Sequence, residues 1–520
     1  MKKTTKLVCL LLAAMMLMSF AGCGSGTQNK VGSTAHDTSP LTLEDTVKVV
    51  AISHPSWPTS DGCKAWEYIK EGTGANVEIT SIPSSDFVQK ITVMFAAPEL
   101  LPDLMTFDDK NGTDFYIPQG AFIPLDDYAD VMPNYTAWVD SLTEEEYNAV
   151  ITTRKAWDGK IYFSPTHGRE AMTGVRAWLY REDLFKKHNL KVPTTKDELI
   201  DVCRKLKELY PDSYPFCIRQ ALQNVSIIGS SWKPYFESSF YYDFENEVWE
   251  YGPREDTMLE VIEFYKLMID EGLAPPDMLT INTGTWQELV ATGKGMIFPE
   301  YQARIDFFDA LGKKNVSPDY QLKAMVPPVM NEKTGVPMVA YKSYDMLGYV
   351  VCNTMDEARI TNAMKYLDWF YTDEAMELLS WGKEGETYEV VDGKKRYITD
   401  ENGTLPDTLY GFTLPGTAAR FDPAMVDAFE SASIAENREM VLEHTLPNLN
   451  PRLWIAFNDE ERNSTADTIT AINAYANEMI HKFILGQEPL SGFEAYQNEL
   501  NELGVDDILK VYEEVYNRLK

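Results

Sequence analysis

The chain has 520 residues, with 80 acidic and 47 basic side chains and a formal net charge of −33. A surface this acidic repels nucleic-acid backbones and anionic lipid headgroups, so we expect neither as a direct partner. The composition is 44% hydrophobic and 12% aromatic, which is enough for several buried cores, and the length corresponds to about three domain-sized units.

The amino-terminal segment has the pattern of a secretory signal. Three early lysines precede an apolar run over residues 7–20, which is too short to span a bilayer comfortably. The small residues 21–22 and then Cys23 follow, which resembles the cleavage site of bacterial lipoproteins, whose cysteine carries the lipid. Phe20 departs from that pattern, which prefers leucine. We expect a signal peptide over residues 1–22 and a lipid anchor on Cys23; an ordinary secretory signal with an incidental cysteine is the alternative.

Residues 23–45 are expected to form a flexible tether. They include the stretch GSGTQNKVGSTAHDTSP, which is small, polar and without periodicity. Because residues 1–22 contain three lysines and no acidic residue, the chain after cleavage would carry a net charge of −36. We interpret this charge as a solubility feature.

Strand and helix patterns alternate from Val47 onward. This order predicts a parallel sheet with right-handed crossovers, in which ligands meet the loops at the carboxyl ends of the strands. The expected strands are residues 47–52, 76–82 and 103–107, the expected helices are 61–71 and 85–97, and the loops are 53–62 and 108–114.

A second group of strand and helix patterns follows, and the chain after Thr372 is expected to be mostly helical. Thr195 stands three residues before Glu198, which is the spacing of a helix capping box. The expected elements are strands at 175–181, 295–300 and 345–352, a hairpin at 241–252, and helices at 256–271 and 356–371.

Other chemistry is not indicated by the sequence. The cysteines that remain after the signal are too dispersed for a disulfide scaffold, and no zinc-protease motif or phosphate-binding glycine loop is present. The acidic stretch over residues 243–256 lacks the glycine and the ligand spacing of an EF-hand. We therefore expect no cofactor, no metal site and no catalytic residue; a surface calcium ion at this stretch is the alternative.

Several stretches in their order resemble one family. They are ELLPDLMTFDD, DGKIYFSP, LYREDLFKKHNLKVPTTKDEL, ATGKGMIFPEYQ, WGKEGETYEVVDGKKRY and the closing residues 481–519. Together they resemble the extracellular solute-binding lipoproteins of sugar importers, the receptor component of ABC transporters, in their large Gram-positive branch. The resemblance covers the chain from Cys23 to Leu519 apart from the tether.

The resemblance implies an α/β fold of two lobes, a hinge and a ligand cleft that closes around the ligand. Lobe one would comprise residues 46–166 and 341–371, and lobe two residues 167–340 and 372–520 with a helical tail. It also implies a monomeric protein on the outer face of the bacterial cytoplasmic membrane that delivers its ligand to the ABC permease.

A cleft for sugars needs flat aromatic side chains and planar polar groups, because a sugar ring has an apolar face and a rim of hydroxyls. We therefore consider aromatic and polar residues in loops, although most of the aromatic residues must serve packing. The candidate ligand-binding residues are His54, Trp57, Phe107, Asp108, Asp109, Trp232, Tyr235, Tyr301, Arg304, Trp381 and Glu384.

The predicted function is a noncatalytic receptor for a carbohydrate, with an oligosaccharide expected as the ligand. The same fold binding a peptide or another small solute is an alternative, because the fold does not fix the ligand. A lipid-anchored glycoside hydrolase is a further alternative. It would need two carboxyl groups about 5 or 6.5–9.5 Å apart across a glycosidic bond.

Overall fold

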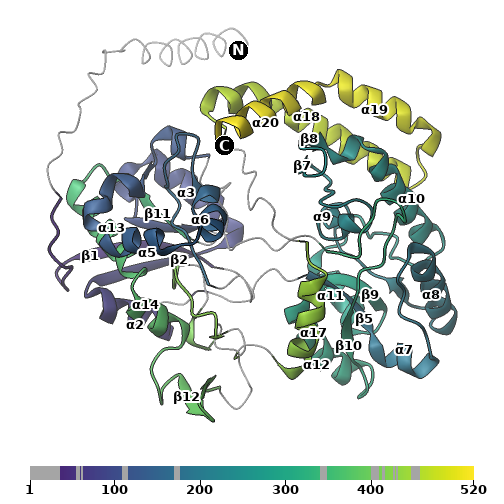
Figure 1. Ribbon diagram of the computed structural model, residues 1–520, viewed down its shortest axis with the longest axis horizontal. Coiled ribbons are helices and arrows are strands. Elements are labelled where there is room, and N and C mark those ends of the chain that lie inside the picture. Colours follow the sequence, from purple (N-terminus) through teal and green to yellow (C-terminus); the bar gives the residue numbers. More distant parts are fainter. Residues whose placement is uncertain are drawn as a thin grey trace, which may run out of the picture. The chain divides into compact units, whose positions relative to one another are not determined.

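The computed structural model describes residues 36–53, 59, 62–107, 115–168, 176–339, 348–399, 409–412, 416–425, 428, 431–446 and 457–519. This part of the chain contains a five-stranded sheet, a four-stranded sheet and two separate hairpins. Each of the two larger sheets has helices of its own beside it (Figure 1).

The first sheet is mixed, with the order β2-β1-β3-β11-β4. β1 (Thr46–Ser53) pairs in parallel with β2 (Asn76–Pro83) and with β3 (Leu104–Phe107). β11 (Gly348–Cys352) pairs antiparallel to β3 and to β4 (Phe122–Ile123). The parallel pairs confirm the prediction for the first three strands, whereas the alternating pattern did not predict the antiparallel β11.

Helices with one apolar face complete the cores around this sheet. In the first of them, Trp66 and Ile69 are buried, and the chain leaves the helix at Gly74 with φ 72°, a left-handed conformation that favours glycine. These helices are α2 (Lys64–Thr73), α3 (Ser84–Ala96), α5 (Pro133–Ser141), α6 (Glu144–Val150), α13 (Glu357–Trp369) and α14 (Asp373–Ser380).

The second sheet has the order β10-β5-β9-β6. β5 (Arg176–Arg181) pairs antiparallel to β9 (Gly295–Tyr301) and to β10 (Leu322–Met325), and β6 (Tyr214–Phe216) pairs with β9 in parallel. Its helices are α7 (Glu182–His188), α8 (Lys196–Leu209), α9 (Val225–Ile228), α10 (Asp256–Asp270), α11 (Thr283–Ala291), α12 (Ile305–Asn315) and α17 (Ala432–Glu443).

The cap predicted at the start of α8 is formed in part. Thr195 Oγ1 accepts the N–H of Glu198 at 3.3 Å, as expected for an N-cap. The Glu198 carboxylate does not return to Thr195; it accepts the N–H and the hydroxyl of Thr194, each at 2.8 Å. The hydrogen bond that a capping box makes from the glutamate back to the cap residue is therefore made to Thr194, the residue before the cap.

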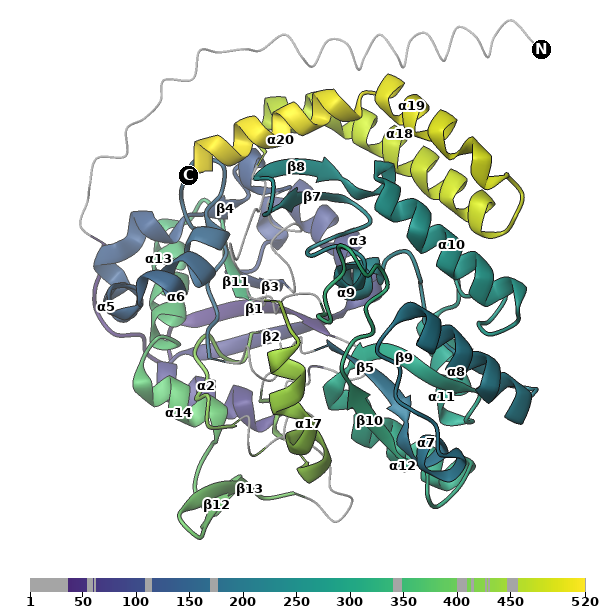
Figure 2. The ribbon, with the colours of Figure 1, turned by 45° about the vertical axis from the view of Figure 1, so that its right-hand side comes forward.

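The carboxyl-terminal helices α18 (Asp459–Ile484), α19 (Phe493–Glu502) and α20 (Val505–Leu519) pack with α10 and with the hairpin β7 (Phe240–Asp243) and β8 (Val248–Tyr251) (Figure 2). The apolar residues Ile469, Ile472, Tyr475, Met479 and Phe483 of α18 belong to this core or pack against it. None of the helices among the described residues is long and apolar enough to cross a bilayer.

The chain after residue 372 differs from the expected helical tail. β12 (Tyr388–Val391) and β13 (Lys394–Tyr397) form a hairpin whose turn, Asp392–Gly393, has φ values of 53° and 77°. Both positive values match a type I′ turn, for which Asp-Gly is a favoured pair. The turn signal was present in the sequence, and the prediction overlooked it.

The described part of residues 373–425 packs around the first sheet. Ala375, Trp381, Phe412 and Met425 belong to the same apolar cluster as β1 and α13. The lobe boundary predicted at residue 371 does not coincide with this packing, because apolar periodicity does not indicate which core a helix joins.

The four cysteines among the described residues are free. Cys203, Cys217 and Cys352 are buried and Cys63 is half-buried. Burial raises the pKa of each thiol above its ordinary value, which is typical of inert structural cysteines.

Candidate functional site

Polar side chains gather at the end of the second sheet where β6 and β9 finish and β5 begins. Arg176, the first residue of β5, pairs in register with Tyr301, the last residue of β9. The Arg176 Cζ lies 3.7 Å from the centre of the Tyr301 ring, and Arg176 Nη2 donates to the tyrosine hydroxyl at 2.6 Å. The flat guanidinium and the ring therefore hold one another in place.

Glu300, the neighbouring residue in β9, has a buried side chain that is 1% exposed. Arg219, which follows β6, donates from Nη2 at 3.1 Å and from Nε at 3.3 Å to Glu300 Oε2. The Arg304 Nη1 lies 3.6 Å from the same oxygen, and the Tyr301 N–H donates to Oε1 at 2.9 Å. One buried carboxylate thus faces two guanidinium groups.

The two arginines also share an aromatic support. The Cζ atoms of Arg219 and Arg304 lie 5.3 Å and 5.9 Å from the ring centre of Trp286. Trp286 is fully buried, and its indole N–H donates to the carbonyl of Cys217 at 2.8 Å. A core side chain that cannot move easily therefore positions both guanidinium groups.

Arg304 differs from Arg219 in its hydrogen bonds. Within the part of the chain that the structure describes, none of its five N–H donors is satisfied by a hydrogen bond, and its side chain is 25% exposed. Burial lowers the pKa of the Arg304 guanidinium below its ordinary value; the Glu300 carboxylate opposes this and the Arg219 charge adds to it. Arg304 is a partly desolvated cation with donors available to a ligand.

The structure brings two of the predicted ligand residues, Tyr301 and Arg304, into this site. Two others lie elsewhere on the surface. Tyr235 is half-buried, has a φ of 60° and places its ring centre 4.7 Å from that of Phe244. Glu384 is exposed in the turn before β12. A ligand contact by any of these residues stays a prediction.

Three predicted aromatic residues are core side chains in this structure. Phe107 is 4% exposed at the end of β3. Trp232 is fully buried with its ring against Phe264, and Trp381 is 2% exposed and stacked on Tyr397. All three side chains are buried, so they offer no platform in this conformation. Sequence context did not reveal this, because each lies at the border of a loop and a regular element.

The remaining predicted residues lie outside the described part of the chain. They are the candidate ligand residues His54, Trp57, Asp108 and Asp109, and the candidate lipid attachment residue Cys23. The loops that follow β1 and β3 therefore stay predicted parts of the site.

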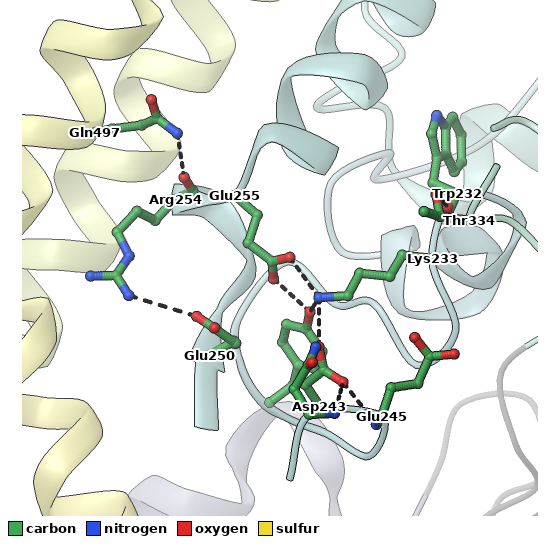
Figure 3. A network of polar contacts seen from close by, with 11 residues as sticks. Trp232, Lys233, Asp243, Glu245, Glu250, Arg254, Glu255, Thr334 and Gln497 are labelled. Atoms are coloured by element: carbon green, nitrogen blue, oxygen red, sulfur yellow. Dashed lines mark hydrogen bonds and ion pairs between the residues drawn. The ribbon is translucent and has the colours of Figure 1, made fainter. Parts of the chain in front are cut away.

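Two acidic residues of the stretch 243–256 pair with a lysine of the protein, Lys233 (Figure 3). The Lys233 Nζ lies 2.8 Å from Asp243 Oδ2 and 2.8 Å from Glu255 Oε2, and it donates to the Tyr241 hydroxyl at 2.9 Å. Burial lowers the pKa of Lys233, but the two carboxylates outweigh it and the net shift is upward. Among the described residues, no group of three or more His, Cys, Asp or Glu side chains is arranged to hold a metal.

The sequence prediction missed Arg176, Arg219 and Glu300. A usable signal was the acid of Glu300 within the otherwise apolar strand GMIFPEY, at the strand end where ligands bind in open α/β sheets. No comparable signal marked Arg176, which begins a strand after a loop.

Two α/β sheets with separate cores, between which the chain passes several times, define a two-lobe binding-protein fold. Residues 59–377 match the model of the bacterial extracellular solute-binding protein family. The chain belongs to this family.

Relatives align with nearly the whole chain. The lipoprotein LipO of Bacillus subtilis is 22% identical over 536 residues, covering 99% of each chain. The fructooligosaccharide ABC transporter substrate-binding protein FusA of Streptococcus pneumoniae is 24% identical over 572 residues, covering 99% of this chain and 98% of FusA.

Solved structures share the fold. The alginate-binding protein AlgQ2 superposes with a TM-score of 0.72 at 20% identity, covering 92% of this chain and all of AlgQ2. FusA in complex with kestose superposes with a TM-score of 0.69 at 18% identity, covering 91% of this chain and 99% of that structure.

Proposed function

We propose that the protein is the substrate-binding component of an ABC importer and that its ligand is an oligosaccharide. The observation that carries the proposal is the alignment over nearly the full length with FusA, which is named for fructooligosaccharide transport. Capture would occur by closure of two lobes around the ligand, and the permease would recognise the closed form.

The geometry at the end of β9 supports a sugar as the ligand. A sugar ring needs a flat apolar surface beside planar hydrogen-bond donors. Tyr301 supplies the ring, and the guanidinium groups of Arg176 and Arg304 supply donors in fixed planes. A catalytic role is not part of the proposal; lobe closure and release account for transport without bond cleavage.

We further propose revised lobe limits. Lobe one would comprise residues 46–166 and 348–425, because the described residues of 373–425 share its core. Lobe two would comprise residues 176–339 and 432–519, since α17 packs on α12 and β10, and α18 packs on α10.

The proposed location is the outer face of the cytoplasmic membrane, with the lipid on Cys23 and the protein acting as a monomer. Growth with a radiolabelled fatty acid should label the full chain and leave a Cys23→Ser variant unlabelled. Label that persists in Cys23→Ser would contradict the anchor and leave the transport proposal untouched.

The ligand class is tested by thermal unfolding of the purified protein against a panel of oligosaccharides and short peptides. A ligand at 100 times its dissociation constant stabilises the folded state by about 2.7 kcal/mol, which is a readily measured shift. We expect stabilisation by at least one oligosaccharide and by no peptide. Stabilisation by peptides alone would favour the alternative ligand class, and cleavage of a bound glycan would favour a hydrolase.

A further inference from the structure

The end of the second sheet carries more positive than negative charge, although the whole chain is strongly acidic. Arg219 and Arg304 lie there beside Glu300, which among the described residues is the only carboxylate within ion-pair distance of either. Arg176, which pairs with Tyr301, lies at the same end of the sheet on its other face, because successive residues of a strand point to opposite faces. Arg176 has no charged partner in the part of the chain that the structure describes, and its donor meets the neutral hydroxyl of Tyr301. Two guanidinium groups therefore share one buried carboxylate, and the third guanidinium at this end of the sheet meets none among the described residues.

Other arginines of the same sheet and its helices are balanced. Arg181 makes a two-bond pair with Asp183, with both distances at 2.7 Å. Arg204 makes a two-bond pair with Glu271, with both distances at 2.6 Å. A paired guanidinium with a matching carboxylate is thus the rule in this region, and the group around Glu300 departs from it.

The excess charge is held in place before any ligand arrives. The buried ring of Trp286 supports Arg219 and Arg304, and the ring of Tyr301 supports Arg176. Arg304 also directly precedes the eleven-residue helix α12, whose amino end favours negative charge. Fixed guanidinium planes suit two-bond recognition of a carboxylate or a sulfate.

We propose that Arg304, beside Arg219, recognises an anionic substituent on the oligosaccharide, namely a uronic-acid carboxylate or a sulfate ester. The proposal rests on the proposed function and narrows it to acidic glycans. Arg304 would make the direct contact, because it is partly exposed and its donors are not used by the described residues. Glu300 would then set the spacing of the guanidinium groups rather than neutralise them.

The test measures binding by titration calorimetry with the full mature protein. The probes are a trimer of galacturonic acid, its neutral methyl ester, a sulfated chondroitin disaccharide and a neutral fructooligosaccharide. We expect one acidic probe to bind, its methyl ester or unsulfated form to bind at least tenfold more weakly, and the affinity to fall with added salt. The uronate and sulfate probes distinguish the two sources of charge.

Two variants locate the contact. Arg304→Gln should weaken the acidic probe about tenfold or more, because a charge-assisted pair is lost. Arg204→Gln removes a surface arginine of the same sheet region, which pairs with Glu271, and should leave the affinity unchanged. Far-ultraviolet circular dichroism and the unfolding midpoint show that each variant is folded.

The outcomes separate the two proposals. Binding of neutral oligosaccharides with no preference for acidic ones overturns this inference and leaves the carbohydrate receptor intact. Binding of no oligosaccharide from either set contradicts the proposed function itself. An acidic probe whose affinity is equal in Arg304→Gln and in the parent protein would overturn the assignment to this cluster.

Discussion

Two buried acids, one in each sheet, have different surroundings. Asp103, just before β3, is 3% exposed and accepts from Arg359 Nε at 2.7 Å and from the Lys48 N–H at 2.7 Å. Glu300, at the end of β9, is 1% exposed and faces two arginines. Burial raises the pKa of Asp103, while Arg359 and the Lys48 N–H oppose it.

These surroundings indicate that Asp103 and Arg359 form a structural pair, whereas Glu300 and its arginines form a candidate binding group. At Asp103 one acid meets one base, and Arg359 also bonds to the Leu101 carbonyl at 3.0 Å, so the pair ties α13 to the chain before β3. At Glu300 the bases outnumber the acid. A buried acid that is paired with one base leaves no charge to attract a ligand. A buried acid that is shared by two bases leaves a positive charge, and the carboxyl end of a strand is where ligands bind.

The largest expected effect follows from removal of the balanced pair. Asp103→Ala leaves the Arg359 charge and the Lys48 N–H without their partner, and Arg359 is 34% exposed, so water compensates in part. We expect a loss of roughly 2–4 kcal/mol in the free energy of unfolding, measured by urea titration. Ligand affinity should not change.

The matched control is Asp86→Ala on the surface of α3, which should change stability by less than about 0.5 kcal/mol. If Asp103→Ala lowers the free energy of unfolding as little as this control does, the pair of Asp103 and Arg359 contributes no stability. Asp103 could then not be distinguished from Glu300 as a structural acid.

Sequence patterns predicted much of the fold and only part of the site. Strands such as β1 and β9 and helices such as α10 follow from local apolar periodicity, so they were predicted to within a few residues. Whether Trp232 faces a cleft or a core depends on residues distant in sequence, such as Phe264, and no local pattern contains that information.

The same reason explains the arginine cluster. Arg219 and Glu300 lie far apart in the sequence and meet only because β6 and β9 are neighbours in one sheet, and Arg176 meets Tyr301 because β5 and β9 are neighbours. Tyr301 and Arg304 were predicted because an aromatic residue and a polar residue come shortly after the expected strand 295–300. The antiparallel pairing of β11 with β3 and the packing of residues 373–425 also depend on contacts between residues distant in sequence, so local patterns could not predict them.

A smaller effect is expected at the unbalanced site. Glu300→Gln keeps one oxygen, which can replace Oε1 and accept from the Tyr301 N–H, but the amide NH2 in place of Oε2 cannot accept from Arg219. The charges of Arg219 and Arg304 are also no longer offset. We expect a loss of roughly 1–2 kcal/mol in urea unfolding, since one hydrogen bond persists while another is lost and repulsion is added.

Sodium sulfate at constant ionic strength gives the distinguishing measurement for Glu300→Gln. If the cluster binds anions, sulfate should recover part of the lost stability of the variant and add little to Asp103→Ala. Equal effects of sulfate on the two variants would indicate general salting-out instead, and would remove the functional distinction between the two acids.

The smallest effect concerns a third buried acid, Asp309. It has no base as close as Arg359 is to Asp103, and it does not face two bases as Glu300 does. Its carboxylate accepts the Leu322 N–H at 2.8 Å, and the Lys313 Nζ is 4.0 Å away. Burial raises the pKa of Asp309 to about 6; the Leu322 N–H and Lys313 lower it in part, and Asp306 and Asp183 raise it further. The folded state therefore holds this proton to a higher pH than the unfolded state does.

The sign of the pH dependence follows from that difference in proton binding. The contribution of protonated Asp309 to stability is present below about pH 4 and is lost as the pH rises through about 6. Asp309→Asn should therefore be more stable than the parent by about 1 kcal/mol at pH 7.5, and the advantage should vanish at pH 4. Asp201→Asn on the exposed side of α8 serves as the control and should show no such crossover. A stability difference at Asp309 that is constant between pH 4 and 7.5 would mean that the carboxyl titrates normally, so that Lys313 balances it as Arg359 balances Asp103.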